Sequence, residues 1–251
     1  GVDIDPTAIE ISRLRAWLSI IVDVKDIKKI KPLPNLDFKF VCANSLIGIE
    51  KGQASFTTDE NLKPELIRIR DEYYATSSKI KKEKLQRDYT KLTHKESLFD
   101  TDETRQLKSY KPFENGRSAS FYDPELMHGV EVFDVVIGNP PYIRHRDLPK
   151  KYKEDLKSRY SVGNTTADIY CYFYEIGYNF LSVQGVLVFI TSNKWMRSRY
   201  GEKLRTFLKD KTKLLEIIDL GGGQFESATV DTNILFFKKT TSPKGHKVKY
   251  G

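Results

Sequence analysis

Cysteine is nearly absent from this chain, with two among 251 residues. Because Cys42 and Cys171 both lie inside apolar stretches, we expect buried, reduced thiols and neither a disulfide framework nor a metal site. Long apolar runs are missing too: none approaches the roughly 18 residues of a membrane span, and no signal peptide opens the chain. These absences predict a cytoplasmic protein without a membrane partner.

The charge is not balanced. Lysine and arginine number 42 against 34 aspartate and glutamate residues, which gives a net charge of +8. A polyanionic partner fits this surplus. Since many soluble proteins are mildly basic, the charge alone does not decide the function.

The stretch Phe133–Tyr142 organises the rest of the chain. Its first five residues are apolar apart from Asp134 and predict a buried strand, which Gly138 and two prolines end abruptly. Asn139 then lies at the carboxyl end of a strand, where ligands bind in open α/β sheets. The prolines restrict the backbone, so the Asn139 side chain and the Pro140 carbonyl are expected to form a rigid pair of hydrogen-bond acceptors.

Tyr142 adds an aromatic face beside these acceptors. Two acceptors and a stacking ring suit a planar amine such as the exocyclic amine of adenine. Its N–H groups would reach Asn139 and Pro140 while its ring lies on Tyr142. The alternative is a strand-ending turn with no further role, because Asn and Pro are common turn residues.

The start of the chain predicts a strand, an acidic turn and a helix. Asp5 is placed as N-cap and Pro6 at the first helical position, and an apolar stripe with a period of 3.6 residues continues to about Val24. Asp3, just after the strand, is a candidate acceptor for ribose hydroxyls, with Ile4 packing on the adenine of a nucleotide cofactor. Alternatively, Asp3 is only a solvated turn carboxylate.

A second strand is expected from Asp37 to about Ala43, which places Asn44 at the same crevice. The Asn44 side-chain oxygen could accept a hydrogen bond from the cofactor's adenine amine, or Asn44 could be an ordinary turn residue. Between about residues 50 and 130 the pattern changes to a charged helical one, with a narrow apolar stripe that reaches Ile80. We expect an inserted helical element, such as a hairpin, whose basic face is solvated.

After the Asn-Pro-Pro-Tyr stretch comes a basic run from Arg144 to Lys153, which either holds the phosphates of an extruded nucleotide or forms a mobile, solvated loop. The further elements are expected in the order helix, strand, helix, strand, strand, at residues 168–181, 185–190, 198–209, 214–220 and 232–238. The glycines at 221–223 lack the Lys-Ser/Thr of a phosphate loop. Phe225 beside them is a candidate second wall for a flipped base, although partial core packing is the default for any Phe.

Taken in order, these motifs resemble the amino-group DNA methyltransferases that use S-adenosylmethionine, and most of all the large adenine-specific enzymes of type IIG restriction-modification and phage-exclusion systems. The segments that carry the resemblance are Gly1–Pro6, Ile11–Ser19, Cys42–Leu46, Phe133–Ile143, Asp168–Glu175, Gly185–Trp195 and Gln224–Leu235. The implied fold class is α/β, with a Rossmann-like S-adenosylmethionine-dependent methyltransferase sheet that is incomplete at the N-terminus and carries a helical insertion. The implied domains are 1–49 for part of the cofactor-binding half, 50–130 for the insertion and 131–251 for the catalytic half.

The resemblance implies S-adenosylmethionine as cofactor and double-stranded DNA with a flipped adenine as partner. Asp3 would bind the ribose and Ile4 the adenine of the cofactor. The residues implied for the target adenine are Asn139, Pro140, Tyr142 and, on the other face of the base, Phe225.

Two departures from the family pattern matter. Asn44 stands where the family often has Asp, so we expect the same role with weaker binding. The glycine-rich first motif is absent and is expected upstream of Gly1, and the segment that reads the DNA sequence is expected beyond Gly251. Without the first strand, the sheet should show a gap and an exposed apolar edge.

Two other functions are compatible with these motifs. A methyltransferase that acts on a protein glutamine amide would use the same acceptors, although the insertion and the basic charge favour DNA. A fragment that binds DNA or another partner without turnover is the alternative outside the enzyme class.

Overall fold

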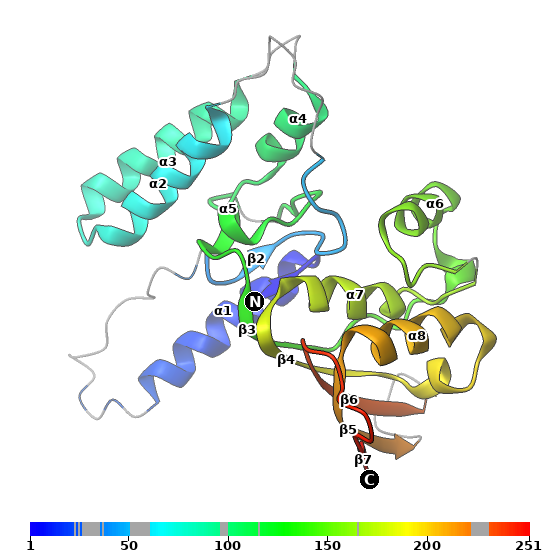
Figure 1. The fold of residues 1–251 in the computed structure, drawn as a ribbon. Helices are drawn as coiled ribbons and strands as arrows, with labels where there is room; N and C mark the ends of the chain where they lie inside the picture. Colours follow the sequence, from blue (N-terminus) through cyan, green and yellow to red (C-terminus); the bar gives the residue numbers. More distant parts are fainter. Residues whose placement is uncertain are drawn as a thin grey trace. The chain divides into compact units, whose positions relative to one another are not determined.

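The chain forms both helices and strands in the computed structural model, which describes residues 1–22, 24, 26, 36, 38–50, 61–95, 100–114, 116–164, 166–221 and 231–251 (Figure 1). The chain divides into two compact units, Gly1–Val130 and Glu131–Gly251. Each unit contains parallel strands joined through a helix, so the α/β class is confirmed. No helix of the described residues combines the length and the apolar character needed to cross a membrane.

The first unit begins with a strand–helix–strand motif. β1 (Val2–Asp3) pairs in parallel with β2 (Val41–Cys42), and α1 (Pro6–Ile21) connects them. The helix begins as predicted, because the Asp5 Oδ1 atom accepts a hydrogen bond from the Thr7 N–H at 2.9 Å and Pro6 lies in the first turn. This motif brings the ends of β1 and β2 to one edge.

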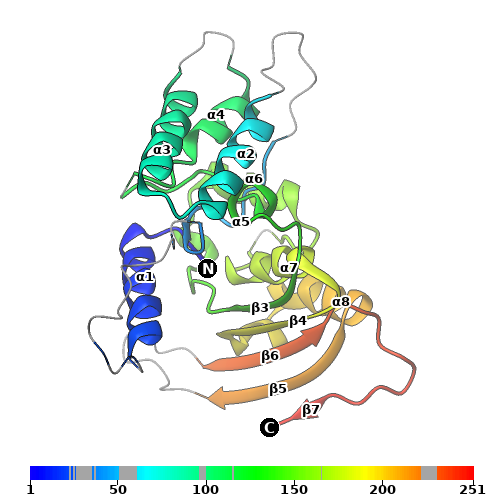
Figure 2. The ribbon, with the colours of Figure 1, turned by 90° about the vertical axis from the view of Figure 1, so that its left-hand side faces the viewer.

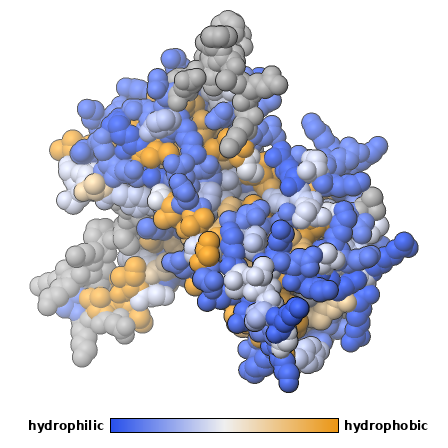
Figure 3. Space-filling view, viewed as in Figure 1, coloured by the Kyte–Doolittle hydropathy of each residue, from blue (hydrophilic) through white to orange (hydrophobic). Residues whose placement is uncertain are grey.

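The apolar stripe of α1 is only partly buried. Ile9 is buried, whereas Leu14 is 52% and Leu18 47% exposed, and Figure 3 shows apolar side chains at the surface along this helix. The reason is length: a 16-residue helix spans about 24 Å, while strands of two residues span roughly 7 Å. The short strands therefore cover only the first turns of α1.

The second strand is shorter than the sequence predicts. β2 begins at Val41, and the turn before it contains Phe38, whose side chain is fully buried. The Phe38 ring packs edge-on against Tyr73 and Phe113, with centroids 5.8 and 5.5 Å apart. Aromatic packing within the helical element thus draws this segment out of the sheet. Asp37 lies outside the described residues.

The helical element of the first unit contains α2 (Leu62–Ala75), α3 (Lys79–His94), α4 (Asp102–Ser109) and α5 (Pro124–His128). α2 and α3 lie side by side as a hairpin (Figures 1 and 2). Ile80 is 79% exposed, so its assignment to the apolar stripe is wrong. The helix breaks after Ala75, and α3 starts a new phase in which Leu85 and Tyr89 are buried.

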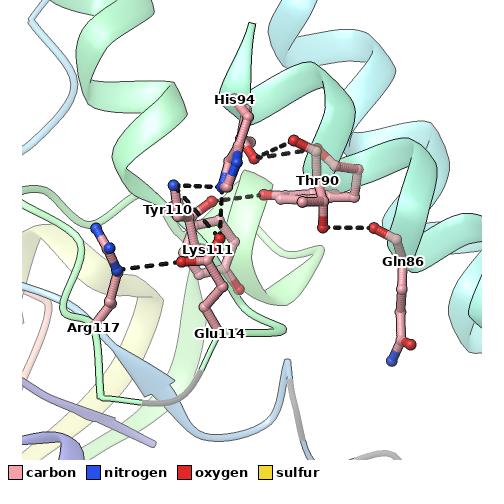
Figure 4. Close-up of polar contacts among 9 residues, drawn as sticks. Gln86, Thr90, His94, Tyr110, Lys111, Glu114 and Arg117 are labelled. Atoms are coloured by element: carbon pink, nitrogen blue, oxygen red, sulfur yellow. Dashed lines mark hydrogen bonds and ion pairs between the residues drawn. The ribbon is translucent and has the colours of Figure 1, made fainter.

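Polar contacts hold the end of α3 to the segment that follows α4 (Figure 4). The His94 Nε2 atom lies 2.7 Å from Glu114 Oε1 and 2.7 Å from the Lys111 Nζ atom. Arg117 approaches the second oxygen of Glu114 at 3.2 Å. Glu114 thus joins the end of α3 to Lys111 and Arg117, so we assign these contacts to the stability of the unit.

The second unit is built on a five-stranded sheet. Its strands are β3 (Phe133–Gly138), β4 (Leu181–Ser192), β6 (Thr232–Lys238), β5 (Lys213–Gly221) and β7 (Lys249–Tyr250), in this spatial order. β3 and β4 are parallel, and β6 is antiparallel to both β4 and β5. The carboxyl ends of β3, β4 and β5 and the start of β6 therefore meet at one edge. The predicted strands of this half are confirmed, with shifted ends, but the expected burial of residues 133–137 is wrong because β3 lies at the edge of the sheet.

Three helices accompany this sheet: α6 (Lys150–Arg159), α7 (Tyr170–Phe180) and α8 (Glu202–Lys211). α7 and α8 cover one face (Figure 2). β3 is an edge strand, with Val135 55% and Ile137 76% exposed, so the sheet shows the expected exposed apolar edge there. Cys171 is buried as predicted, but Cys42 in the first unit is only partly buried, because it ends a strand at the sheet edge.

Candidate active site

The Asn-Pro-Pro-Tyr stretch lies directly after β3, as the sequence predicts. Asn139 is exposed, Pro140 is buried and Tyr142 is half-buried. Gly138 is required at the strand end, because a Cβ atom there would lie 2.9 Å from Cε1 of Phe189 on β4. The buried proline and the close approach of β3 to β4 fix the backbone of residues 139–142, which we call the corner. The Asn139 side chain is exposed to solvent there.

Tyr142 is tied to the neighbouring strand. Its hydroxyl donates a hydrogen bond to the Ile190 carbonyl at 3.4 Å, and partial burial raises the pKa of the phenol. The phenol therefore stays protonated at neutral pH and keeps its donor role. This bond holds the ring within the same edge as Asn139.

A buried polar network lies at the end of β4, next to the bond made by Tyr142. The Tyr174 hydroxyl lies 2.7 Å from the Thr191 hydroxyl, and the Asn233 Oδ1 atom accepts hydrogen bonds from Trp195 Nε1 at 3.2 Å and from Thr191 at 3.4 Å. All four side chains are buried. Sequence reasoning gave these residues no role, since polar residues at the ends of apolar strands look like ordinary turn residues. Their hydrogen bonds stiffen the end of β4, next to the residue that binds the Tyr142 hydroxyl.

The predicted cofactor-binding residues lie in the first unit. β1 ends at Asp3 and β2 at Cys42, and these two residues are paired in the ladder. Asp3, Ile4 and Asn44 are therefore brought to the carboxyl edge of two neighbouring parallel strands. Asp3 and Ile4 are exposed, and Asn44 is half-buried.

Both polar members of this group also make local hydrogen bonds. The Asp3 Oδ1 atom accepts the Asp5 N–H at 2.9 Å, and the Asn44 Oδ1 atom accepts the Leu46 N–H at 3.1 Å. The turn role considered for Asn44 is thus present. A carboxylate has several lone pairs, so the turn at Asp3 leaves acceptor capacity for a ligand.

The last predicted residue, Phe225, lies outside the described residues, and no position is assigned to it. Asp219, near the end of β5, accepts hydrogen bonds from the Gly221 N–H and from Asn193 Nδ2, both at 3.2 Å. These bonds lower the pKa of Asp219, and the bond from the Gly221 N–H has the larger effect. The end of β5 is therefore anchored to the end of β4 at the same edge as Asn139.

Comparison with known proteins identifies the family. The Eco57I restriction-modification methylase family matches residues 1–225. Two similar proteins are the type II methyltransferases M.BstVI of Geobacillus stearothermophilus and M.PaeR7I of Pseudomonas aeruginosa. Each is 39% identical over 88 residues, which cover 35% of this chain and 16% and 15% of the relative.

Among solved structures, the M protein of the type I restriction enzyme EcoKI is similar at 15% identity, with a TM-score of 0.34, over 74% of this chain and 44% of the other. The chain spans much less than two thirds of the length of the curated relatives named above. The family match, in contrast, covers most of the chain. The chain therefore belongs to the Eco57I restriction-modification methylase family.

Proposed function

We propose that this chain transfers a methyl group from S-adenosylmethionine to the exocyclic amine of adenine in double-stranded DNA. The reaction would take place in the cytoplasm, as part of a restriction-modification or phage-defence enzyme. The observation that carries the proposal is the corner after β3, where Asn139 is exposed at the end of a rigid strand and Tyr142 lies beside it. Family membership and the type II methyltransferase relatives support DNA as the substrate.

The corner suits the chemistry of an aromatic amine. The lone pair of the adenine amine is delocalised into the ring, so its nitrogen is a weak nucleophile. Acceptors at Asn139 Oδ1 and the Pro140 carbonyl would bind the two N–H groups and favour a nitrogen with a localised lone pair. Because one acceptor is a backbone carbonyl and the other extends from the same proline-restricted segment, little reorganisation is needed when charge develops.

Extrusion of the base determines the roles of the aromatic residues. An adenine stacked in duplex DNA cannot reach the corner, and unstacking it costs a few kcal/mol. Stacking on Tyr142, and on Phe225 from the other side, would offset this cost. The amine loses a proton to solvent after it has accepted the methyl group.

The first unit offers groups that fit the cofactor. Asp3 has acceptor capacity for ribose hydroxyls, the exposed Ile4 offers an apolar surface for the adenine ring, and Asn44 an amide oxygen for its amine. S-adenosylmethionine supplies, when bound, an activated sulfonium methyl group. The chain's own residues then have to bind and orient the two reactants.

The proposal is tested by methyl transfer with labelled S-adenosylmethionine and the whole protein. The substrate is unmethylated genomic DNA in one reaction and cell-extract protein in a parallel one, and the labelled nucleosides and amino acids are identified by mass spectrometry. We expect N6-methyladenine. Label on cytosine, label on glutamine amides of protein, or no transfer at all would each contradict the proposal, and the last two correspond to the two alternative functions.

A further inference from the structure

The segment that follows Tyr142 is held in place by hydrogen bonds. The Asp168 Oδ1 atom accepts the His145 N–H at 3.0 Å, and the Ile169 N–H donates to the Ile143 carbonyl at 3.1 Å. The main chain is therefore fixed at two points directly after the corner. The cations of the segment nevertheless remain exposed to solvent.

Asp168 is itself supported from the opposite side. Its Oδ2 atom accepts a hydrogen bond from the Tyr200 hydroxyl at 3.2 Å, and that hydroxyl lies 2.8 Å from the hydroxyl of Tyr170. Burial raises the pKa of Tyr200 to about 12, so its proton is retained at neutral pH. Both oxygens of Asp168 are thus used to join the segment after the corner to a tyrosine pair.

This anchored segment is strongly basic on its outer surface. Its exposed cations are Arg144, Arg146, Lys150 and Lys151, which we call the basic run. Within the described part of the chain, Arg144, Lys150 and Lys151 form no ion pair, and Arg146 only approaches its exposed neighbour Asp147 at 3.6 Å. The positive charge of the run is therefore available to a partner.

We propose that the basic run binds the phosphates of the DNA strand from which the adenine is extruded, and that Asp168 is a positioning residue that holds the run beside the corner. The identity of the partner rests on the proposed function. An extruded base leaves its flanking phosphates at the rim of the pocket, where cations two residues beyond Tyr142 can reach them. Phosphate contacts there would fix the register of the strand relative to Asn139.

The contribution of the cations is tested by the salt dependence of DNA binding. Each phosphate contact contributes about 0.9 to the slope of log affinity against log salt. The double variant R144A/R146A should reduce the magnitude of this slope by roughly 2. The matched control is K209A/K211A, two exposed lysines in the last turn of α8, which should leave the slope unchanged. Equal slopes for wild type and R144A/R146A would overturn the proposal.

The role of Asp168 is tested by comparing two variants. For Asp168→Ala, a pure charge effect and a positioning effect predict opposite changes in DNA affinity. Asp168→Ala and Asp147→Ala each remove one negative charge from the basic segment. If charge alone matters, both variants bind DNA at least as tightly as wild type. If Asp168 positions the run, Asp168→Ala binds DNA about tenfold more weakly or worse, while Asp147→Ala does not.

A thermal melt accompanies each variant. If Asp168→Ala fails to fold, Tyr200→Phe removes the bond to Asp168 Oδ2 together with the contact to the Tyr170 hydroxyl, and it should weaken DNA binding by a smaller factor in the same direction. Tight binding by a folded Asp168→Ala or by Tyr200→Phe would contradict the positioning role. These binding experiments need no methyl transfer. A protein that binds DNA through the run but methylates no adenine would therefore refute the proposed function, whereas the phosphate contacts of the run and the positioning role of Asp168 would still stand.

Discussion

At the scale of single residues, Tyr142 has two separable properties. Its ring offers a stacking face, and its hydroxyl makes a long bond of 3.4 Å to the Ile190 carbonyl. Base stacking on an aromatic side chain contributes about 1 to 3 kcal/mol, whereas a long, partly exposed hydrogen bond contributes less. We therefore expect the ring to dominate.

The substitutions Tyr142→Phe and Tyr142→Ala separate these properties. The phenylalanine variant keeps the face, so its kcat/KM for DNA should remain within about threefold of wild type. The alanine variant should lose roughly 5- to 150-fold, which corresponds to the stacking energy. Steady-state methylation rates test this, and equal losses in the two variants would show that the hydroxyl is the important group.

At the scale of elements, the packing of α7 on the sheet depends on one glycine. A Cβ atom at Gly177 would lie 2.5 Å from Leu187 Cδ1 and 3.1 Å from Phe189 Cζ. Phe189 is also the residue that contacts Gly138 at the end of β3. Phe189 of β4 thus contacts both α7 and the end of β3.

Gly177→Ala should therefore destabilise the second unit by about 1 to 3 kcal/mol, the usual cost of overpacking. Denaturant unfolding measures this. Gly48→Ala is the matched control, because nothing lies within 4 Å of a Cβ atom there. If the two variants unfold alike, α7 does not depend on this close approach.

Local signals predicted the elements well. Gly138 and two prolines mark the end of β3, and Asp5 with Pro6 marks the start of α1, because such residues act on their own backbone. The bonds of Asp168 and Asn233 escaped prediction because they join segments distant in the sequence. The exposure of the apolar stripe of α1 and the late start of β2 were not predicted for the same reason. The periodicity of apolar residues does not show which other segment packs against that side of an element.

At the scale of the whole molecule, each unit has its own buried ionisable groups. In the first unit, burial lowers the pKa of His128 to about 4. Its Nδ1 atom lies 2.9 Å from the Phe38 carbonyl. In the second unit, partial burial also lowers the pKa of His145.

The stability of the first unit should fall as the pH falls from about 6.5 towards 4. The unfolded chain takes up a proton at His128 near pH 6.5, whereas the folded chain does so only near pH 4, so acid favours unfolding. Between pH 7.5 and 5 the loss is about 2 kcal/mol. Urea unfolding at the two pH values tests this, with His128→Gln as the variant that removes the difference. An equal pH dependence in that variant would contradict the assignment.

The central claim is that Asn139 binds the amine that is methylated. Its most direct test is the rate of adenine methylation by Asn139→Ala in the whole protein, with Asn179→Ala, an exposed asparagine of α7, as control. We predict a loss of at least about 100-fold in kcat for Asn139→Ala, the size expected for removal of one preorganised group, and no loss for the control. Undiminished methylation by a folded Asn139→Ala would contradict the claim.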